Sequence, residues 1–114
     1  MLAEETKMKI YEALGLVGVP VCHPPYVGDA HTYITYQLLG QDSVLYAEGK
    51  EQETAVTYAV NIFAEKFTAG IVALTKFALE TAGYIATVEA EVYDGTADTT
   101  QVSLIATKEG AEYG

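Results

Sequence analysis

The residues of this chain that could bind a metal ion fall in one short segment. Cys22 and His23 are adjacent, and Asp29 and His31 follow a few residues later. Zinc takes four such ligands, or three and a water, in a tetrahedron. Successive side chains of an extended segment point to opposite sides, so Cys22 and His23 are poorly placed to share an ion. A Cys–His nucleophile would also need an orienting acid and an oxyanion site, which the sequence does not offer. We therefore expect a buried cysteine beside loop histidines, with no metal and no cofactor.

Two carboxylates offer a second kind of chemistry. Glu89 and Glu91 alternate along a candidate strand, which places them on one face about 7 Å apart, a spacing loosely compatible with the acid and base of glycoside hydrolysis. Such a reaction needs a cleft that buries the sugar, and a short chain without Trp has little with which to build one. Asp94 and Asp98 around Gly95 lack the further ligands and the closing Glu of a calcium loop. We expect a solvated strand followed by a plain hairpin turn, and no catalysis.

Composition restricts both the architecture and the partners. A chain of 114 residues, half of them apolar, is long enough for one core, so we expect a single domain over 1–114 with a frayed tail at 109–114. The chain carries 16 acidic residues against 6 lysines, has no Arg, and has a formal charge of -10. Phosphate binding draws on clustered cations, so specific nucleic-acid binding is not expected.

The compartment follows from what the sequence lacks. One cysteine gives no intrachain disulfide. No basic region followed by an apolar block marks a signal peptide, and no apolar run approaches the roughly 20 residues that span a bilayer. We expect a soluble protein made in a cytoplasm, without membrane contact.

The first half of the chain predicts a helix followed by strands. Apolar residues recur at helical spacing over residues 2–14, with Gly15 as the stop. Three prolines in Gly18–Pro25 indicate an edge strand or a strapped loop. Residues 31–39 alternate as a strand, with Thr32, Ile34, Tyr36 and Leu38 on one face. Residues 43–47 are a shorter strand after a loop at Gly40–Ser43.

The second half predicts a hairpin, a helix and a final pair of strands. A charged turn at Glu48–Glu53 leads into a strand at 54–64. Thr68 caps a helix that Gly83 ends. The buried stripe of that helix is expected to be Ile71, Leu74, Phe77 and Ala78. Two strands with apolar alternation close the chain on either side of a turn at 94–98. The fold class is therefore α+β, a single mixed or antiparallel sheet of about five strands with two helices on one face.

Several segments, taken in this order of elements, resemble a known family. They are Tyr33-Ile34-Thr35-Tyr36-Gln37, Tyr58-Ala59-Val60-Asn61-Ile62-Phe63 and Ala78-Leu79-Glu80-Thr81-Ala82-Gly83-Tyr84. Together with the charged hairpin and the closing strand pair, they are similar to the small tail-completion or tail-terminator proteins of long-tailed bacteriophages, over roughly residues 7 to 108.

The resemblance implies a structural virion protein that forms a ring, commonly a hexamer, from subunits that can be monomers when free. Such a ring caps the head-proximal end of the tail tube and docks the tail to the head connector. The expected partners are copies of this chain, the tail-tube protein and the connector or adaptor protein. The protein would be made in the cytoplasm of the host bacterium, with no enzyme activity.

In such a ring, subunit contacts are expected at the charged hairpin tip, the preceding loop and one strand. The candidate interface residues are Tyr33, Gln41, Asp42, Glu48, Lys50, Glu51 and Glu53. The tip could equally be a solvated turn. A negative lumen would keep passing DNA from adhering to the wall, and an acidic chain suits this need. A second hypothesis for Glu89 and Glu91 is therefore that they face the lumen.

Other functions stay open at this stage. The chain could be a head-side connector adaptor or a tail-tube subunit. A small acidic inhibitor that mimics DNA is an alternative of another class, and would carry carboxylates at the spacing of duplex phosphates. A ligand-binding module would need a deep apolar pocket with convergent polar groups.

Overall fold

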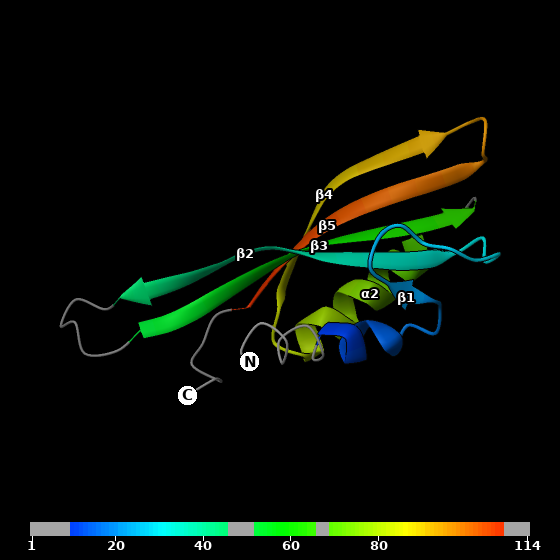
Figure 1. The fold of residues 1–114 in the computed structure, drawn as a ribbon. Coiled ribbons are helices and arrows are strands. Elements are labelled where there is room, and N and C mark those ends of the chain that lie inside the picture. The colour runs from blue at the N-terminus through cyan, green and yellow to red at the C-terminus, as the bar shows by residue number, and fades with distance from the viewer. Residues whose placement is uncertain (1–9, 46–51, 66–68, 109–114) are drawn as a thin grey trace.

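The computed structural model describes residues 10–45, 52–65 and 69–108. The described strands form one sheet in the order β1-β2-β3-β5-β4 (Figure 1). Its elements are β1 (Val21–Cys22), β2 (Tyr33–Leu45), β3 (Gln52–Glu65), α2 (Ala69–Thr81), β4 (Ile85–Asp94) and β5 (Thr99–Lys108). An N-terminal helix, helical at residues 10–15 of the described part, precedes them. β1 runs parallel to β2 and the other pairs are antiparallel.

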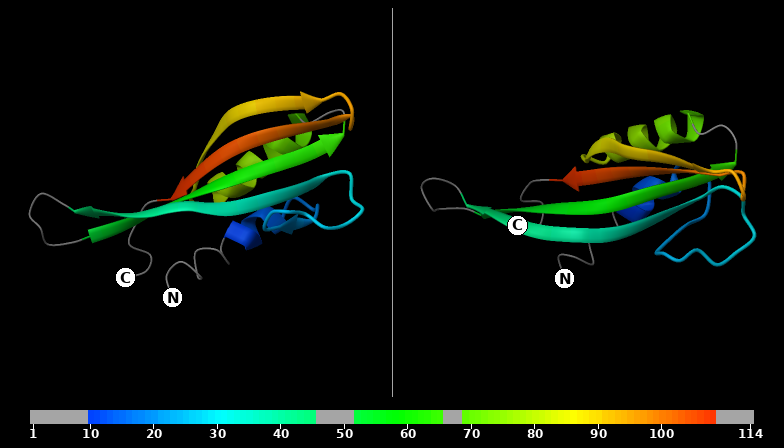
Figure 2. Two further views of the ribbon diagram at one scale, coloured as in Figure 1. Left: turned by 45° about the horizontal axis from the view of Figure 1, so that its top comes forward. Right: turned by 90° about the horizontal axis from the view of Figure 1, so that it is seen from above.

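Both helices lie on the same face of the sheet (Figure 2). Ile10 and Leu14 of the N-terminal helix and Leu79 of α2 are fully buried in one core with side chains from four of the strands. On the sheet, the core residues alternate along each strand: Ile34, Tyr36, Val56, Tyr58, Val60, Ile62, Ala86, Val102, Leu104 and Ala106. The α+β prediction, with a mixed five-stranded sheet and two helices on one face, is confirmed.

The loop expected at Gly40–Ser43 does not exist. β2 runs without interruption to Leu45, and Gly40 pairs with Thr57 while Ser43 pairs with Thr54. A register shift between Leu38 and Gly40 leaves Leu39 without a partner, so the irregularity is a bulge at Leu39 in one long strand. This is a correction: a glycine followed by polar residues suggested a loop in the sequence, but pairing with β3 keeps the segment in the strand.

The buried stripe of α2 is rotated from the predicted one. Thr75, Ala78 and Leu79 are buried, whereas Leu74 is 56% exposed and Phe77 is 69% exposed. Ala78 and the half-buried Ile71 were therefore placed correctly, but Leu74 and Phe77 were not. Thr75 fits the apolar side because its hydroxyl donates to the Ile71 carbonyl oxygen at 2.7 Å within the helix.

The end of α2 is the one that the sequence predicts. Gly83 has φ 100°, in the left-handed region that Gly adopts without the steric cost of a Cβ. The Tyr84 amide donates to the Leu79 carbonyl at 2.9 Å, and the Gly83 amide donates to the Glu80 carbonyl at 3.0 Å. This cap turns the chain directly into β4. The Thr68 cap and the tail at 109–114 lie outside the described residues.

Candidate interaction surface on the open sheet face

The sheet face opposite the helices carries a stack of three aromatic rings. The Tyr26 and Tyr33 ring centroids are 4.1 Å apart, those of Tyr33 and Phe63 are 4.7 Å apart, and both pairs are stacked with their planes 18° apart. Tyr33 and Phe63 are register partners on β2 and β3, so the pairing itself brings these rings together. We call Tyr26, Tyr33 and Phe63 the aromatic stack.

A polar cluster lies next to the stack on the same face. The Asn61 side-chain oxygen accepts from the Gln101 amide nitrogen at 3.2 Å and from the Ser103 hydroxyl at 2.7 Å. Asn61 pairs with Ser103 across β3 and β5, and Gln101 pairs with Phe63. The bond to Asn61 holds the Gln101 side chain on the open face, and strand register places Gln101 opposite Phe63.

Between the stack and the β4–β5 turn the surface is hollowed into a groove of about 540 Å³. We call it the open-face groove. Its lining residues are Tyr33, Phe63, Val92, Tyr93, Asp94, Ala97, Thr99 and Gln101. Tyr33, Phe63, Gln101 and Val92 form one row across four strands by register. This row and residues of the β4–β5 turn together line the groove.

Hydrogen bonds hold that turn in shape. Asp94 Oδ1 accepts from the amides of Thr96 and Ala97, and the Tyr93 hydroxyl donates to Asp98 Oδ1 at 2.9 Å. The bond and the charge of Asp98 raise the pKa of Tyr93 above its ordinary value, because the carboxylate favours the protonated phenol. Asp98 has φ 53°, a left-handed conformation that Asp tolerates.

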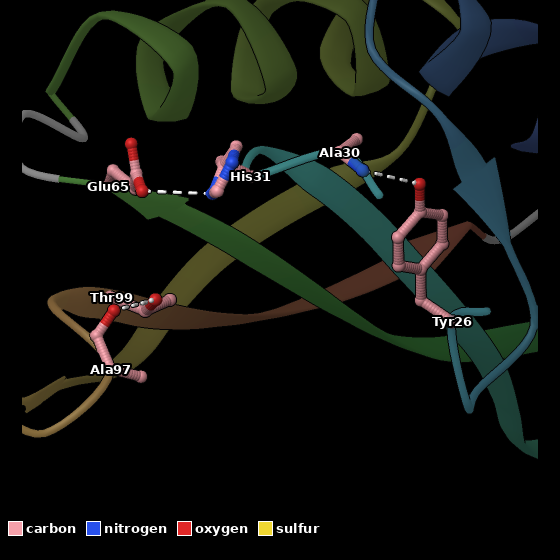
Figure 3. A network of polar contacts seen from close by, with 6 residues as sticks. All are labelled: Tyr26, Ala30, His31, Glu65, Ala97 and Thr99. Atoms are coloured by element: carbon pink, nitrogen blue, oxygen red, sulfur yellow. Dashed lines mark hydrogen bonds and ion pairs between the residues drawn. The ribbon is translucent and has the colours of Figure 1, made fainter. Parts of the chain in front are cut away.

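The loop and strand ends beside the groove are tied by further contacts, shown in Figure 3. His31 Nδ1 lies 2.9 Å from Glu65 Oε2, and the Ala30 amide donates to the Tyr26 hydroxyl at 3.0 Å. A Cβ added at Gly28 would collide with that hydroxyl. The segment before β2 is therefore folded around Tyr26, which places its ring on the stack.

The predicted interface residues lie in different parts of the chain. Tyr33 is half-buried on the open face and lines the groove. Gln41 and Asp42 belong to the paired strand β2 and not to a loop, opposite Val56 and Ala55. Glu53 lies in β3 opposite Val44. The remaining predicted positions, Glu48, Lys50 and Glu51, lie outside the described residues.

Glu89 and Glu91 are both exposed on β4. The strand pairing shifts register between Val88 and Ala90, so Glu89 has no partner in β5, while Glu91 pairs with Val102. The regular alternation from which a shared face was inferred is therefore interrupted between the two carboxylates. β4 is exposed at every residue except Ala86.

The two histidines of the candidate metal segment contact different partners. His23 lies against Tyr36, with ring centroids 4.5 Å apart, whereas His31 pairs with Glu65. Cys22 is half-buried in β1. Burial, with smaller contributions from Tyr11 and Cys22, raises the pKa of Tyr36. Among the described residues, no three His, Cys, Asp or Glu side chains gather as metal ligands would.

Sequence reasoning selected Tyr33 but missed Asn61, Phe63 and Gln101. Their signal was available as the second face of each alternating strand, because residues at odd positions of β3 and β5 lie opposite the core residues. What the sequence could not supply was the strand register that brings these three side chains together. In the described part of the chain, no helix is long and apolar enough to cross a membrane.

Comparison with known proteins gives distant structural likenesses, among them a virion chain. No family model matches this chain, and no curated protein matches it. A chain from a solved structure described as the virion of a native gene transfer agent particle is similar over 89% of this chain and 92% of its own length. The TM-score is 0.49 and the sequence identity is 14%. Nothing about the function of this chain follows from a similarity this low.

Proposed function

We propose that this protein is a structural component of a phage-like virion, which assembles as a ring, caps the head-proximal end of the tail tube and joins the tail to the head connector. The observation that carries the proposal is a two-stranded arm, made of residues 42–45 of β2 and 52–55 of β3. Pairing with β1 reaches only Thr35 on β2, and pairing with β5 begins at Val56 on β3. In the described part of the chain the arm has no third strand.

A two-stranded arm is expected to be stabilised by packing against a partner. Isolated two-stranded hairpins are marginally stable in water, and both edges of this one present unpaired backbone groups. The arm extends along the long axis of a body with extents of 54 × 23 × 22 Å (Figure 1). A neighbouring subunit that packs on the arm makes a head-to-tail contact, which closes into a ring when the rotation fits.

Charge supports the same role. With a formal charge of -10 and no Arg, the chain builds a ring whose lumen repels a passing duplex, so the DNA does not adhere to the wall. The exposed Glu89 and Glu91 on β4 are our candidates for the lumen surface. The resemblance to tail-terminator proteins narrows the proposal from a ring to a tail-capping ring.

The test adds the purified protein to tails assembled in its absence. Electron microscopy of the tube ends, together with the infectivity gained when DNA-filled heads are supplied, measures capping and joining separately. A defined end ring with restored joining is the expected result. Tubes of uncontrolled length without joining would refute the terminator role. A ring that binds isolated heads would then indicate an adaptor, whereas binding to a DNA-handling enzyme would indicate a DNA mimic.

The arm is tested by the variant Glu48→Ser/Glu51→Ser/Glu53→Ser, which removes three charges from Glu53 and from the segment that connects β2 to β3. A control variant, Glu12→Ser/Glu80→Ser, removes two charges from the helical layer, where both residues are exposed. We expect the first variant to lose joining and the second to keep it. Joining that survives in both variants would show that the three carboxylates are not needed for joining the tail to the head.

A further inference from the structure

Most of the hydrogen-bonding side chains of the open-face groove present acceptors. The Thr99 hydroxyl donates to the Ala97 carbonyl at 3.1 Å, the Tyr93 hydroxyl donates to Asp98, and the Gln101 amide donates to Asn61. The Thr99 and Tyr93 hydroxyls have each used their single proton, so they offer a ligand oxygen lone pairs, and the Gln101 amide offers its side-chain oxygen and its second N–H. Asp94 adds a carboxylate, which accepts only. Acceptors therefore predominate in the polar lining, which favours a ligand that supplies donors.

The apolar part of the groove has a matching chemistry. Tyr33 and Phe63 both line the groove, and Phe63 is the end ring of the aromatic stack, next to Gln101 by register. Aromatic faces attract cations, and a guanidinium in particular can stack flat on them while its edge donates hydrogen bonds. Phe63 and Gln101 are register partners, which sets a flat wall and an acceptor side by side.

We propose that the open-face groove binds an arginine side chain of another protein. The guanidinium lies against the Phe63 ring. It donates to the side-chain oxygen (Oε1) of Gln101 and to the Asp94 carboxylate. Because this chain contains no Arg, a second copy of it cannot supply the ligand, and the occupant is a different protein. The proposal goes beyond the ring function and does not depend on it, since the groove is formed by one subunit.

The electrostatic surroundings select the same partner. This end of the sheet carries the acidic residues Glu65, Asp94 and Asp98. Glu65 of β3 and Asp94 of β4 both pair with Thr99 of β5, one on each side of that strand. Within the described residues the lysines are Lys76 on α2 and Lys108 at the far end of β5. A basic segment is attracted to this end, and an acidic one is repelled.

The experiment uses the full chain, labelled with ¹⁵N, and three blocked peptides. The first alternates valine and arginine (Val-Arg-Val-Arg-Val), the second replaces arginine by lysine, and the third replaces it by citrulline, which keeps the planar shape without the charge. NMR titration gives each dissociation constant and the residues that respond. We expect the arginine peptide to shift the Gln101 side-chain amide and the Phe63 amide, and to bind about threefold more tightly than the lysine peptide. The citrulline peptide should bind at least about fivefold more weakly.

Two groove variants and a matched control test the assignment. Asp94→Asn removes one negative charge while keeping an oxygen that can accept from Thr96 and Ala97, so the turn is retained. Glu91→Gln removes one charge from the same strand outside the groove. We expect about fivefold weaker arginine-peptide binding for Asp94→Asn and less than about twofold for Glu91→Gln. Phe63→Leu, which keeps an apolar side chain but loses the ring, should weaken binding about threefold.

Two results would overturn the proposal. One is equal weakening by Asp94→Asn and Glu91→Gln, which would mean attraction to the acidic surface as a whole. The other is shifts that avoid Phe63 and Gln101 in the unaltered protein. Urea unfolding of each variant verifies that it is folded, and the response of the unaltered protein to the three peptides decides the question even if Phe63→Leu is unstable.

Discussion

On β3, Asn61 and Ile62 are neighbours in sequence and lie on opposite faces of the sheet. Ile62 is fully buried under the helices, while Asn61 is half-buried and binds Gln101 and Ser103. The helix-covered face is closed by a core in which buried tyrosines pack among aliphatic side chains, and the open face carries an aromatic stack, an amide cluster and a groove. One face of these strands is therefore buried in the core and stabilises the fold, and the other stays open to a partner.

The largest effect expected from this contrast is on β3 itself. Ile62→Ala removes a fully buried side chain and should lower the free energy of unfolding by about 2 to 5 kcal/mol. Asn61→Ala breaks two hydrogen bonds in a half-exposed setting, where water can replace the lost partner, and should cost about 1 kcal/mol. Urea unfolding of both variants measures the ratio. A larger loss for Asn61→Ala would reverse the roles of the two faces.

A similar contrast runs around α2. Leu79→Ala should lose about 2 to 4 kcal/mol, because Leu79 is fully buried in the core. Phe77→Ala should stay within about 0.5 kcal/mol of the unaltered protein, since the ring is mostly exposed. Thermal unfolding of the two variants in parallel checks the rotation of the helix. A severe loss for Phe77→Ala in the isolated chain would support the stripe expected from the sequence.

The junction between the helical layer and the sheet gives a smaller effect. Gly83→Ala places a Cβ at φ 100°, and 3.3 Å from the Lys108 Cε atom, so it should cost about 1 to 2 kcal/mol. Gly70→Ala is the control, because its Cβ would meet no atom within 4 Å and alanine favours the helix. Unfolding curves should separate the two in opposite directions. Equal shifts would contradict the left-handed cap.

The smallest expected effect concerns proton binding at the edge of the open face. Asp98→Asn removes the charge that holds the Tyr93 proton, so the pKa of Tyr93 should fall back toward its ordinary value near 10. A raised folded-state pKa stabilises the protein below the ordinary value and loses that contribution as the pH rises through the raised one. NMR of the Tyr93 ring between pH 8 and about 12 follows the titration directly. An unchanged midpoint in the variant would disprove the role of Asp98.

Alternation and glycine chemistry made much of this architecture predictable. The core positions Tyr36, Tyr58 and Leu104 follow from period-two patterns, and the Gly83 cap follows from the conformational freedom of that residue. The predictions failed where two local patterns were equally good. α2 contains two overlapping apolar stripes, and which one is buried depends on how the helix rotates against the sheet.

The chain by itself determined the element order, the fold class, the two faces of each central strand and the acidic, Arg-free character of the surface. Only the tertiary structure decided that Gly40 continues a strand, that a bulge separates Glu89 from Glu91, and that Phe63, Gln101 and Asp94 line one groove. The physical reason is the range of the interactions. Periodicity and capping act within a few residues, whereas register and strand order are fixed by pairing between segments some forty positions apart, as Asn61 and Gln101 are.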